Sequence, residues 1–261
     1  MPDQFPRVSL YHTQERRIFC QHVQREYRLD VVLPNGYDTS TQAYPVVYVL
    51  DGDVNTGMAH SATAVLGMSF GTPDIIVVGI SYDLERMEQW GELREVDFKV
   101  PEVKDAPANS HAELFLKALT GEIVPFIEAH YRAHRDQRIL YGYSSSGFFA
   151  LYALLHEPDA FRTYLAGSPD LYISCDYWQA HDQTLKLRPA TPPIQLYMSI
   201  GDHEFEGSWM PFYHELVNVI NTRRYPGVSL ISDIYAGEEH GPLGAAMTYI
   251  RGLVQTLPAN K

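Results

Sequence analysis

The chain has 261 residues, 45% of them hydrophobic, and carries a formal net charge of −12. A chain of this size can bury roughly 70–75% of its unfolded surface, so it can fold without disulfides or structural metals. Because the acidic excess is spread out and no cluster of Lys and Arg occurs, the composition argues against binding to nucleic-acid phosphates.

The first ten residues and the two cysteines indicate a compartment. Residues 1–10 contain two prolines and one positive charge but no apolar core, which is not typical of a secretory signal. The longest apolar runs are far shorter than the roughly 18 residues that span a membrane. Cys20 and Cys175 form neither a CxxC pair nor a metal spacing. We expect a cytoplasmic protein without membrane association and with two reduced thiols, a disulfide being the alternative.

Short apolar segments alternate with helical patterns along the chain. An alternating pair at about 18–33 comes first, followed by apolar runs at 46–50, 75–80, 139–141, 164–166, 194–200 and 228–234. The central runs are apolar on both faces, as buried parallel strands are. Helical spacing marks 112–131, 145–156, 209–221 and 243–257. The pattern predicts one domain over 1–261, a mostly parallel, doubly wound α/β sheet with antiparallel N-terminal strands.

The stretch 84–110 interrupts this alternation. It has seven acidic residues, two prolines and no clear period. Irregular segments of this length are functional or poorly ordered. Because it follows a central strand, it can fold over the carboxyl edge of the sheet as a lid, and a solvated excursion is the alternative.

The segment 138–152 predicts a nucleophile elbow. An apolar strand runs into Gly142, a serine-rich turn follows, and an apolar helix begins directly afterwards. In such a turn a serine is strained and exposed, and the next backbone N–H points at the developing oxyanion. We favour Ser144 over Ser145 as the nucleophile, because three small residues of the helix can then face the sheet. A serine-rich helix cap is the alternative.

With this elbow the chain resembles the putative-esterase family of α/β hydrolases, from about Val8 to Leu253. The family includes siderophore-trilactone esterases, S-formylglutathione hydrolases, feruloyl esterases and mycolyl transferases, and the resemblance is strongest to small bacterial members of the trilactone branch. It implies the α/β-hydrolase fold and serine esterase activity. The segments that carry it are YPVVYVLDG at 44–52, EIVPFIEAHY at 122–131, GYSSSGFFALY at 142–152, PDAF at 158–161 and AGSP at 166–169.

The chain departs from the family pattern at three places. Tyr143 stands where the family often has His before the serine, and Ser146 replaces the first glycine after it. Residues 110–112 (SHA) replace the family's GGA before the long helix. These changes leave the nucleophile in place and bear on the substrate.

The base and the acid are expected after the serine, in the order acid, then histidine. His240, in the segment GEEHGP before the last helix, matches the family's histidine loop. We choose Glu204 as the acid, because the third residue after the strand-ending glycine carries it in this fold. Asp202 is the second choice and Glu206 the third.

The remaining site residues follow from their neighbours. We expect two backbone N–H groups to donate to the oxyanion, those of Ser145 and Asp53. Asp53 follows the glycine that permits a tight turn after the strand 46–50. No cofactor and no metal are expected, because HExxH and similar ligand clusters do not occur. Residues that could contact substrate, with ordinary loop packing as the alternative, are Trp90, Arg94, Tyr172, Trp178 and Trp209.

The sequence therefore predicts a serine hydrolase that cleaves small carboxylic esters through an acyl-enzyme intermediate. We prefer a short-chain or aromatic ester, because a net charge of −12 offers no steering for an anionic ferric catecholate. A siderophore trilactone esterase and a thioesterase are the alternatives. A non-catalytic binding protein on the esterase scaffold is the rival from a different class.

Overall fold

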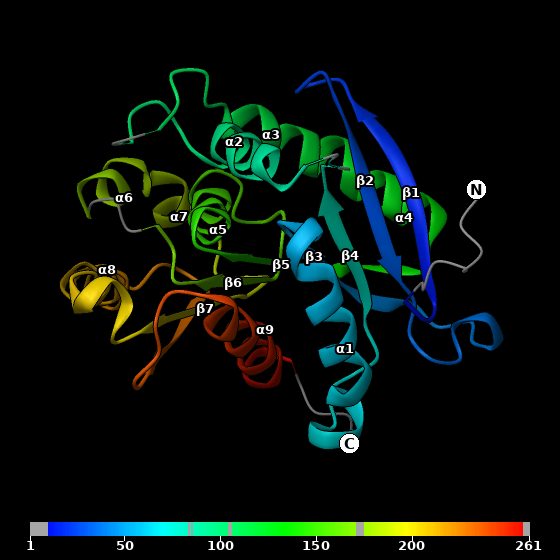
Figure 1. The fold of residues 1–261 in the computed structure, drawn as a ribbon. Helices are drawn as coiled ribbons and strands as arrows, with labels where there is room; N and C mark the ends of the chain where they lie inside the picture. The colour runs from blue at the N-terminus through cyan, green and yellow to red at the C-terminus, as the bar shows by residue number, and fades with distance from the viewer. Residues whose placement is uncertain (1–9, 83, 85, 104–105, 171–174, 258–261) are drawn as a thin grey trace.

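The computed structural model describes residues 10–82, 84, 86–103, 106–170 and 175–257 (Figure 1). The described residues form one eight-stranded sheet in the order β1-β2-β4-β3-β5-β6-β7-β8. β2 pairs antiparallel with both β1 and β4, and every other neighbouring pair is parallel. The strands are β1 (Thr13–Cys20), β2 (Arg25–Val32), β3 (Tyr44–Val49), β4 (Ile76–Ser81), β5 (Ala133–Tyr143), β6 (Thr163–Gly167), β7 (Ile194–Gly201) and β8 (Val228–Tyr235). The predicted α/β-hydrolase sheet is confirmed.

Burial explains why the central strands are apolar along their whole length. Every residue of β3 and β4 is buried, whereas most residues of β1 and β8 at the edges are half-buried or exposed. Successive side chains of β3 enter opposite cores: Val46 and Tyr48 face one, Val47 and Val49 the other. Helices must therefore cover both faces of the sheet.

Two helices cover one face and the remaining helices cover the other (Figure 1). α1 (Gly52–Phe70) and α9 (Pro242–Thr256) pack side by side on the first face. The second face carries α2 (Met87–Phe98), α3 (Ala112–Ala118), α4 (Val124–His130), α5 (Ser145–His156), α6 (Cys175–His181), α7 (Gln183–Leu187) and α8 (Met210–Arg223). Short 3₁₀ turns lie at η1 (Tyr37–Thr39) and η3 (Glu204–Gly207).

Two expectations need correction. The stretch 84–110, expected to be irregular, contains the helix α2, whose buried side chains include charged Arg94 and Asp97. A helix that buries ion-paired residues shows no apolar period, so the hydrophobicity pattern missed it. The predicted helix 112–131 is interrupted by the π-turn η2 (Leu119–Ile123), after which α4 starts with a proline in its first turn.

Two further sequence predictions concern the cysteines and the membrane. Cys20 is buried and free, and burial, reinforced by Glu122, raises the pKa of its thiol to about 12. The side chain of Cys175 lies outside the described residues. Within the described part of the chain, no helix combines the length and hydrophobicity needed to cross a bilayer.

Candidate active site

Ser144 lies at a sharp turn between β5 and α5. Its backbone has φ 61° and ψ −124°, a region that non-glycine residues rarely occupy and that is typical of functional strain. Small neighbours make the turn possible: a Cβ on Gly142 would lie 2.0 Å from the Ser146 carbonyl oxygen, and one on Gly147 would lie 2.5 Å from that of Gly167. The structure therefore contains the elbow expected from the sequence, at the carboxyl edge of the parallel strands.

His240 meets Glu204 beside this elbow. His240 lies just before α9, and its Nδ1 is 2.8 Å from Glu204 Oε2. His240 and Ser144 line the same cavity, of about 420 Å³. With Nδ1–H donating to the carboxylate, the lone pair of His240 Nε2 is left to accept a proton. Asp202, the second choice, accepts a hydrogen bond from the Gly237 N–H at 2.7 Å instead, and Glu206 is exposed.

The Glu204 carboxylate is fully buried and accepts several hydrogen bonds. One oxygen faces His240; the other accepts from the Ser168 hydroxyl and, at 2.9 Å, from the Gly201 N–H. Burial acts to raise the pKa of Glu204, but the hydrogen bonds from His240, Ser168 and Gly201 outweigh burial and hold its pKa below the ordinary value. Glu204 is therefore ionised at neutral pH and fixes the orientation of the imidazole.

Tyr143, which departs from the family pattern, joins the elbow to this pair. Its hydroxyl accepts from the Gly241 N–H at 3.2 Å and donates to Glu204 Oε1 at 3.4 Å. Its ring centroid lies 5.0 Å from that of His240. Burial, the largest influence, raises the pKa of Tyr143 to about 12, so the hydroxyl stays protonated and acts as a donor. No pattern in the sequence indicates this role of Tyr143, because the role depends on contacts across the sheet edge.

A buried ion pair forms the opposite wall of the cavity. Asp51, in the left-handed region with φ 54°, follows β3. Arg94 of α2 donates through Nε and Nη2 to the two oxygens of Asp51, at 2.9 and 2.8 Å. Trp90 Nε1 donates to the same carboxylate at 3.0 Å, and the Ser146 hydroxyl donates at 2.6 Å. Ser146 thus replaces the usual glycine with a hydroxyl that ties the elbow to α1 and α2.

Comparison with known proteins agrees with this geometry. The family described as "Putative esterase" matches residues 20–219. The chain belongs to the putative esterase family. It is similar to the ferri-bacillibactin esterase BesA of Bacillus subtilis (strain 168), with 31% identity over 207 residues, 74% of this chain and 71% of the relative. As a family member, the protein is a carboxylic-ester hydrolase.

Solved structures share the esterase fold. A BES protein from Bacillus cereus superposes with a TM-score of 0.82 and 22% identity, covering 96% of this chain and 97% of the other. The siderophore hydrolase EstB from Aspergillus nidulans gives a TM-score of 0.82 and 22% identity, covering 97% of both chains. The sheet and its helices therefore have the arrangement seen in these proteins.

The predicted substrate contacts of this esterase divide into three groups. Trp90 and Arg94 line the candidate catalytic cavity. Trp209 stacks on Phe205, and the ring centroid of Trp209 lies 5.6 Å from that of His240. Trp178 does not reach the cavity: it is fully buried in α6, and its N–H donates to Tyr225, so its role is packing. Tyr172 lies outside the described residues.

Asp97 has a structural partner set rather than a substrate-facing one. It is fully buried, and its carboxylate accepts from both Arg25 and the Tyr27 hydroxyl, at 2.7 and 2.6 Å. His111 Nε2 lies 2.9 Å from the other oxygen. Arg94 and Asp97, three residues apart on α2, therefore do not pair with each other, because each has a different partner.

The expected oxyanion donors are both at helix starts. Ser145 is the first residue of α5 and Asp53 the second of α1, and N–H groups there have no acceptor within their helix. The Ser145 hydroxyl points elsewhere, donating to Glu95 at 2.5 Å. The Asp53 carboxylate accepts from the Tyr82 N–H at 2.7 Å.

The Asp51–Arg94 pair leads to a stability prediction. In Asp51→Asn the side chain still fits the left-handed backbone, but Arg94 loses a buried countercharge, so the free energy of unfolding is expected to fall by about 3 kcal/mol. The double variant Asp51→Asn/Arg94→Met should lose less than the sum of the two single variants. Urea denaturation measures all four proteins. Strictly additive losses would show that the pair is not coupled.

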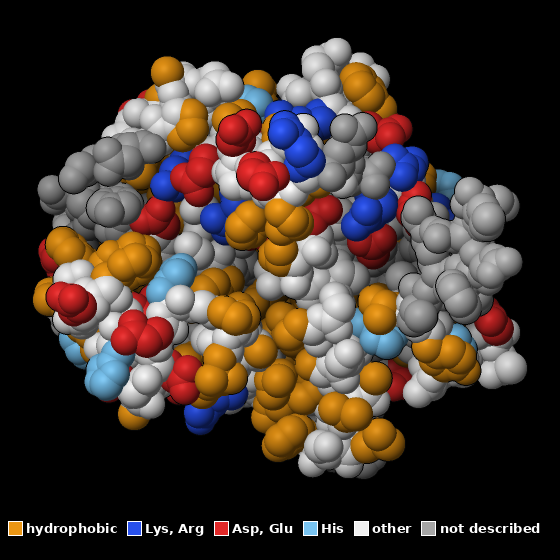
Figure 2. All heavy atoms as spheres, viewed as in Figure 1, with side chains coloured by type: hydrophobic (Ala, Val, Ile, Leu, Met, Phe, Trp, Pro, Cys, Tyr) orange, Lys and Arg blue, Asp and Glu red, His pale blue; other side chains and the backbone are white. Residues whose placement is uncertain are grey.

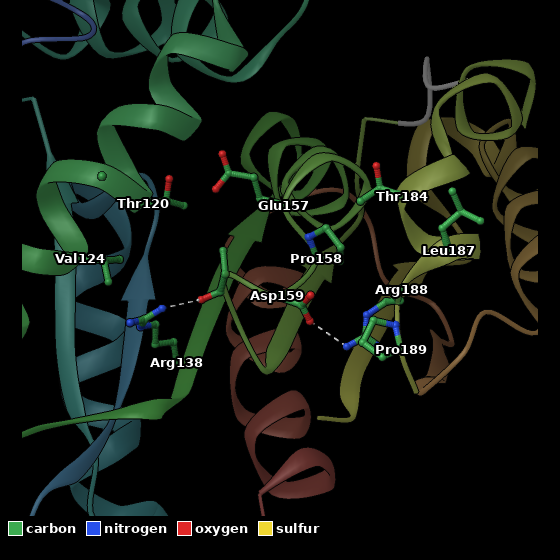
Figure 3. A pocket seen from close by; sticks show the side chains of 12 residues that line it. Thr120, Val124, Arg138, Glu157, Pro158, Asp159, Thr184, Leu187, Arg188 and Pro189 are labelled. Carbon is green, nitrogen blue, oxygen red and sulfur yellow. Dashed lines mark hydrogen bonds and ion pairs between the residues drawn. The ribbon is translucent and has the colours of Figure 1, made fainter. Parts of the chain in front are cut away.

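A larger hollow, of about 780 Å³, is lined by η2, α4, the middle of β5, the residues that follow α5, and α7 with the two residues after it (Figure 3). Its arginines are already paired: Arg138 Nε donates to Glu128 at 2.6 Å, and Arg188 Nη2 donates to Asp159 at 2.8 Å. The residues that line it include no serine, histidine or cysteine. The smaller cavity at Ser144 is therefore the candidate active site.

Proposed function

We propose that the protein cleaves its ester by a serine mechanism, with Ser144 as nucleophile, His240 as general base and Glu204 as the acid that orients the base. The observation that carries this proposal is the 2.8 Å contact between His240 Nδ1 and buried Glu204, behind a cavity that His240 and Ser144 line together. A base aligned by a third group beside an exposed nucleophile is the arrangement used by serine hydrolases.

The reaction proceeds in two halves. Ser144 Oγ attacks the ester carbonyl carbon while His240 Nε2 takes the hydroxyl proton. The N–H groups of Ser145 and Asp53 donate to the oxyanion, and each such donor contributes about 10²–10³-fold in kcat. Breakdown of the tetrahedral intermediate breaks the C–O bond, and His240 protonates the departing alcohol. Water then attacks the acyl-enzyme by the same route and releases the acid.

The cavity favours an uncharged ester. Among the described residues that line the cavity, Arg94 is the one positively charged arginine or lysine. Asp51 already neutralises the charge of Arg94. The short-chain or aromatic carboxylic ester expected from the sequence therefore suits this wall. A siderophore ester is the second candidate, favoured because BesA and EstB are described as a ferri-bacillibactin esterase and a siderophore hydrolase. A thioester would follow the same route.

Covalent labelling tests the nucleophile directly. Diisopropyl fluorophosphate is expected to inactivate the protein at one equivalent, and fragmentation of the labelled peptide should place the phosphoryl group on Ser144. His240→Ala, which removes the base, should label at least a hundred-fold more slowly. A phosphoryl group on Ser145, or inactivation without any adduct, would contradict the proposal. Parallel assays with p-nitrophenyl butyrate and a trilactone siderophore then separate the two substrate candidates.

A further inference from the structure

An apolar strip follows the seam between α1 and α9, seen in Figure 2 as the hydrophobic side chains that run down the lower centre of the view. On α1, Val54 and Val65 are 44% and 48% exposed, and on α9, Leu243 is 58% exposed. We call this surface the α1/α9 strip. Its members are Val54, Met58, Val65, Met68, Leu243, Met247, Ile250 and Val254.

The strip lies on one side of each helix. The α1 members recur at intervals of three, four and seven residues, with exposed Ser61 between Met58 and Val65 on the same side, and the α9 members likewise project from one side of their helix. Charge is sparse along the strip: residues 54–73 contain no Asp, Glu, Lys or Arg, and Arg251 is the one such residue between Leu243 and Val254, although 20% of the chain is charged. A solvent-facing helix normally bears charged residues on its exposed side. This face is therefore suited to an apolar occupant.

The strip begins at the catalytic cavity. Val54, Pro242 and Ala245 line that cavity together with Ser144 and His240. A group attached to the reacting carbonyl that leaves the cavity between α1 and α9 therefore meets Met58 and Leu243 next. Between Val54 and Val65 the helix rises about 17 Å, farther than a short acyl group reaches. The occupant that matches this position is a hydrocarbon chain of the substrate.

We propose that the α1/α9 strip binds the hydrocarbon chain of an uncharged carboxylic ester, so that the protein prefers medium- and long-chain acyl esters to short ones. The proposal rests on the serine mechanism given above, keeps its uncharged ester, and replaces the short acyl chain expected from the sequence with a longer one. Each methylene moved from water onto apolar surface strengthens binding about four-fold when fully covered. With half of that coverage, kcat/KM for p-nitrophenyl octanoate should exceed that for the butyrate by roughly ten-fold or more.

Charge placed on the strip tests the proposal. Met58→Glu, one helical turn from Val54, is expected to lower the octanoate-to-butyrate ratio of kcat/KM about ten-fold. Val65→Glu lies farther from the cavity and should lower the hexadecanoate-to-octanoate ratio instead. Leu187→Glu, an equally drastic change at an exposed leucine that lines the hollow of Figure 3, is the matched control and should shift neither ratio. All substrates are used below the concentration at which they aggregate, and circular dichroism checks the fold.

The outcomes separate the two proposals. Chain-length ratios that are the same in wild type, Met58→Glu and Val65→Glu overturn the strip as an acyl site. So does a wild-type dimer, seen by sedimentation, that Met58→Glu converts to a monomer with the ratios unchanged, since the strip would then cover a second copy of the chain. Failure of the serine mechanism has a different signature: the wild type does not hydrolyse p-nitrophenyl butyrate, or Ser144→Ala still hydrolyses it.

Discussion

Ser144→Ala is expected to lower kcat for p-nitrophenyl butyrate by roughly 10⁵–10⁶-fold, the loss found when a serine protease loses its nucleophile. The attacking oxygen is removed, while the backbone N–H of Ser145 at the start of α5 remains. What persists is the catalysis that oxyanion donors and binding supply. Stopped-time assays at high enzyme concentration measure such residual rates. The fold should be unaffected, because the substitution removes only a hydroxyl group from a side chain that lines the cavity.

Ser145→Ala is the comparison that identifies the reacting serine. Its hydroxyl donates to Glu95 rather than into the cavity, and alanine keeps the backbone N–H that faces an oxyanion. The variant is expected to lose less than about ten-fold in kcat, since the hydrogen bond that is removed lies outside the reacting centre. If Ser145→Ala were inactive and Ser144→Ala active, the elbow would be displaced by one residue and the oxyanion assignment would fall with it.

Glu204→Gln is expected to lower kcat by about 10³–10⁴-fold, as the equivalent amide substitution does in a serine protease. The carboxylate accepts from His240 Nδ1 and, on its other oxygen, from Ser168 and Gly201. Those two donors hold the amide oxygen of glutamine on their side, so its NH₂ group faces Nδ1. The imidazole must then present Nε2–H to Ser144 and cannot accept its proton. Steady-state assays at neutral pH measure the loss.

Asp202→Asn is the matched control for the acid. Asp202 accepts a hydrogen bond from the Gly237 N–H and none from His240, so its amide variant should lose less than ten-fold in kcat.

The pH dependence of stability gives a second test of Glu204. Its pKa is lowered in the folded state, so its ionised form stabilises the fold above the unfolded pKa, and this contribution disappears as pH falls through the folded pKa. The difference in unfolding free energy between wild type and Glu204→Gln should therefore shrink toward acid pH. A difference that stays constant with pH would contradict a stabilising role of the ionised carboxylate.

The sheet was predictable because burial leaves a pattern in the sequence. β3 and β4 are buried on both faces and have uninterrupted apolar runs, so their positions were found within one or two residues. α1 was missed because its exposed side is apolar and its buried side is small, with Gly52, Ala59 and Ala62 against the sheet. α2 was missed because it buries charge rather than hydrocarbon. In both helices the contrast between polar and apolar sides, on which periodicity depends, is absent.

The site was predictable where chemistry and chain order are linked. Ser144 follows from its turn, His240 from its loop and Glu204 from its distance after β7, all features of local sequence. The side-chain roles of Asp51 and Tyr143 were not found, because these two residues meet partners 39 to 98 residues away. Such contacts depend on the three-dimensional arrangement of several loops, and a single sequence records the residue types but not their meeting.

The attachment of α2 determines how substrate can enter. Arg94 of α2 is paired with Asp51 at the wall of the cavity. One turn later on the same helix, Asp97 is paired with Arg25 of β2. Lifting α2 away from the sheet would separate two buried ion pairs at once, at a cost of several kcal/mol each. We therefore expect α2 to act as a fixed wall of the cavity rather than as a lid. Ester and products are then expected to pass on the side opposite α2, beside the first turns of α1 and α9, where uncharged Val54, Pro242 and Ala245 line the cavity.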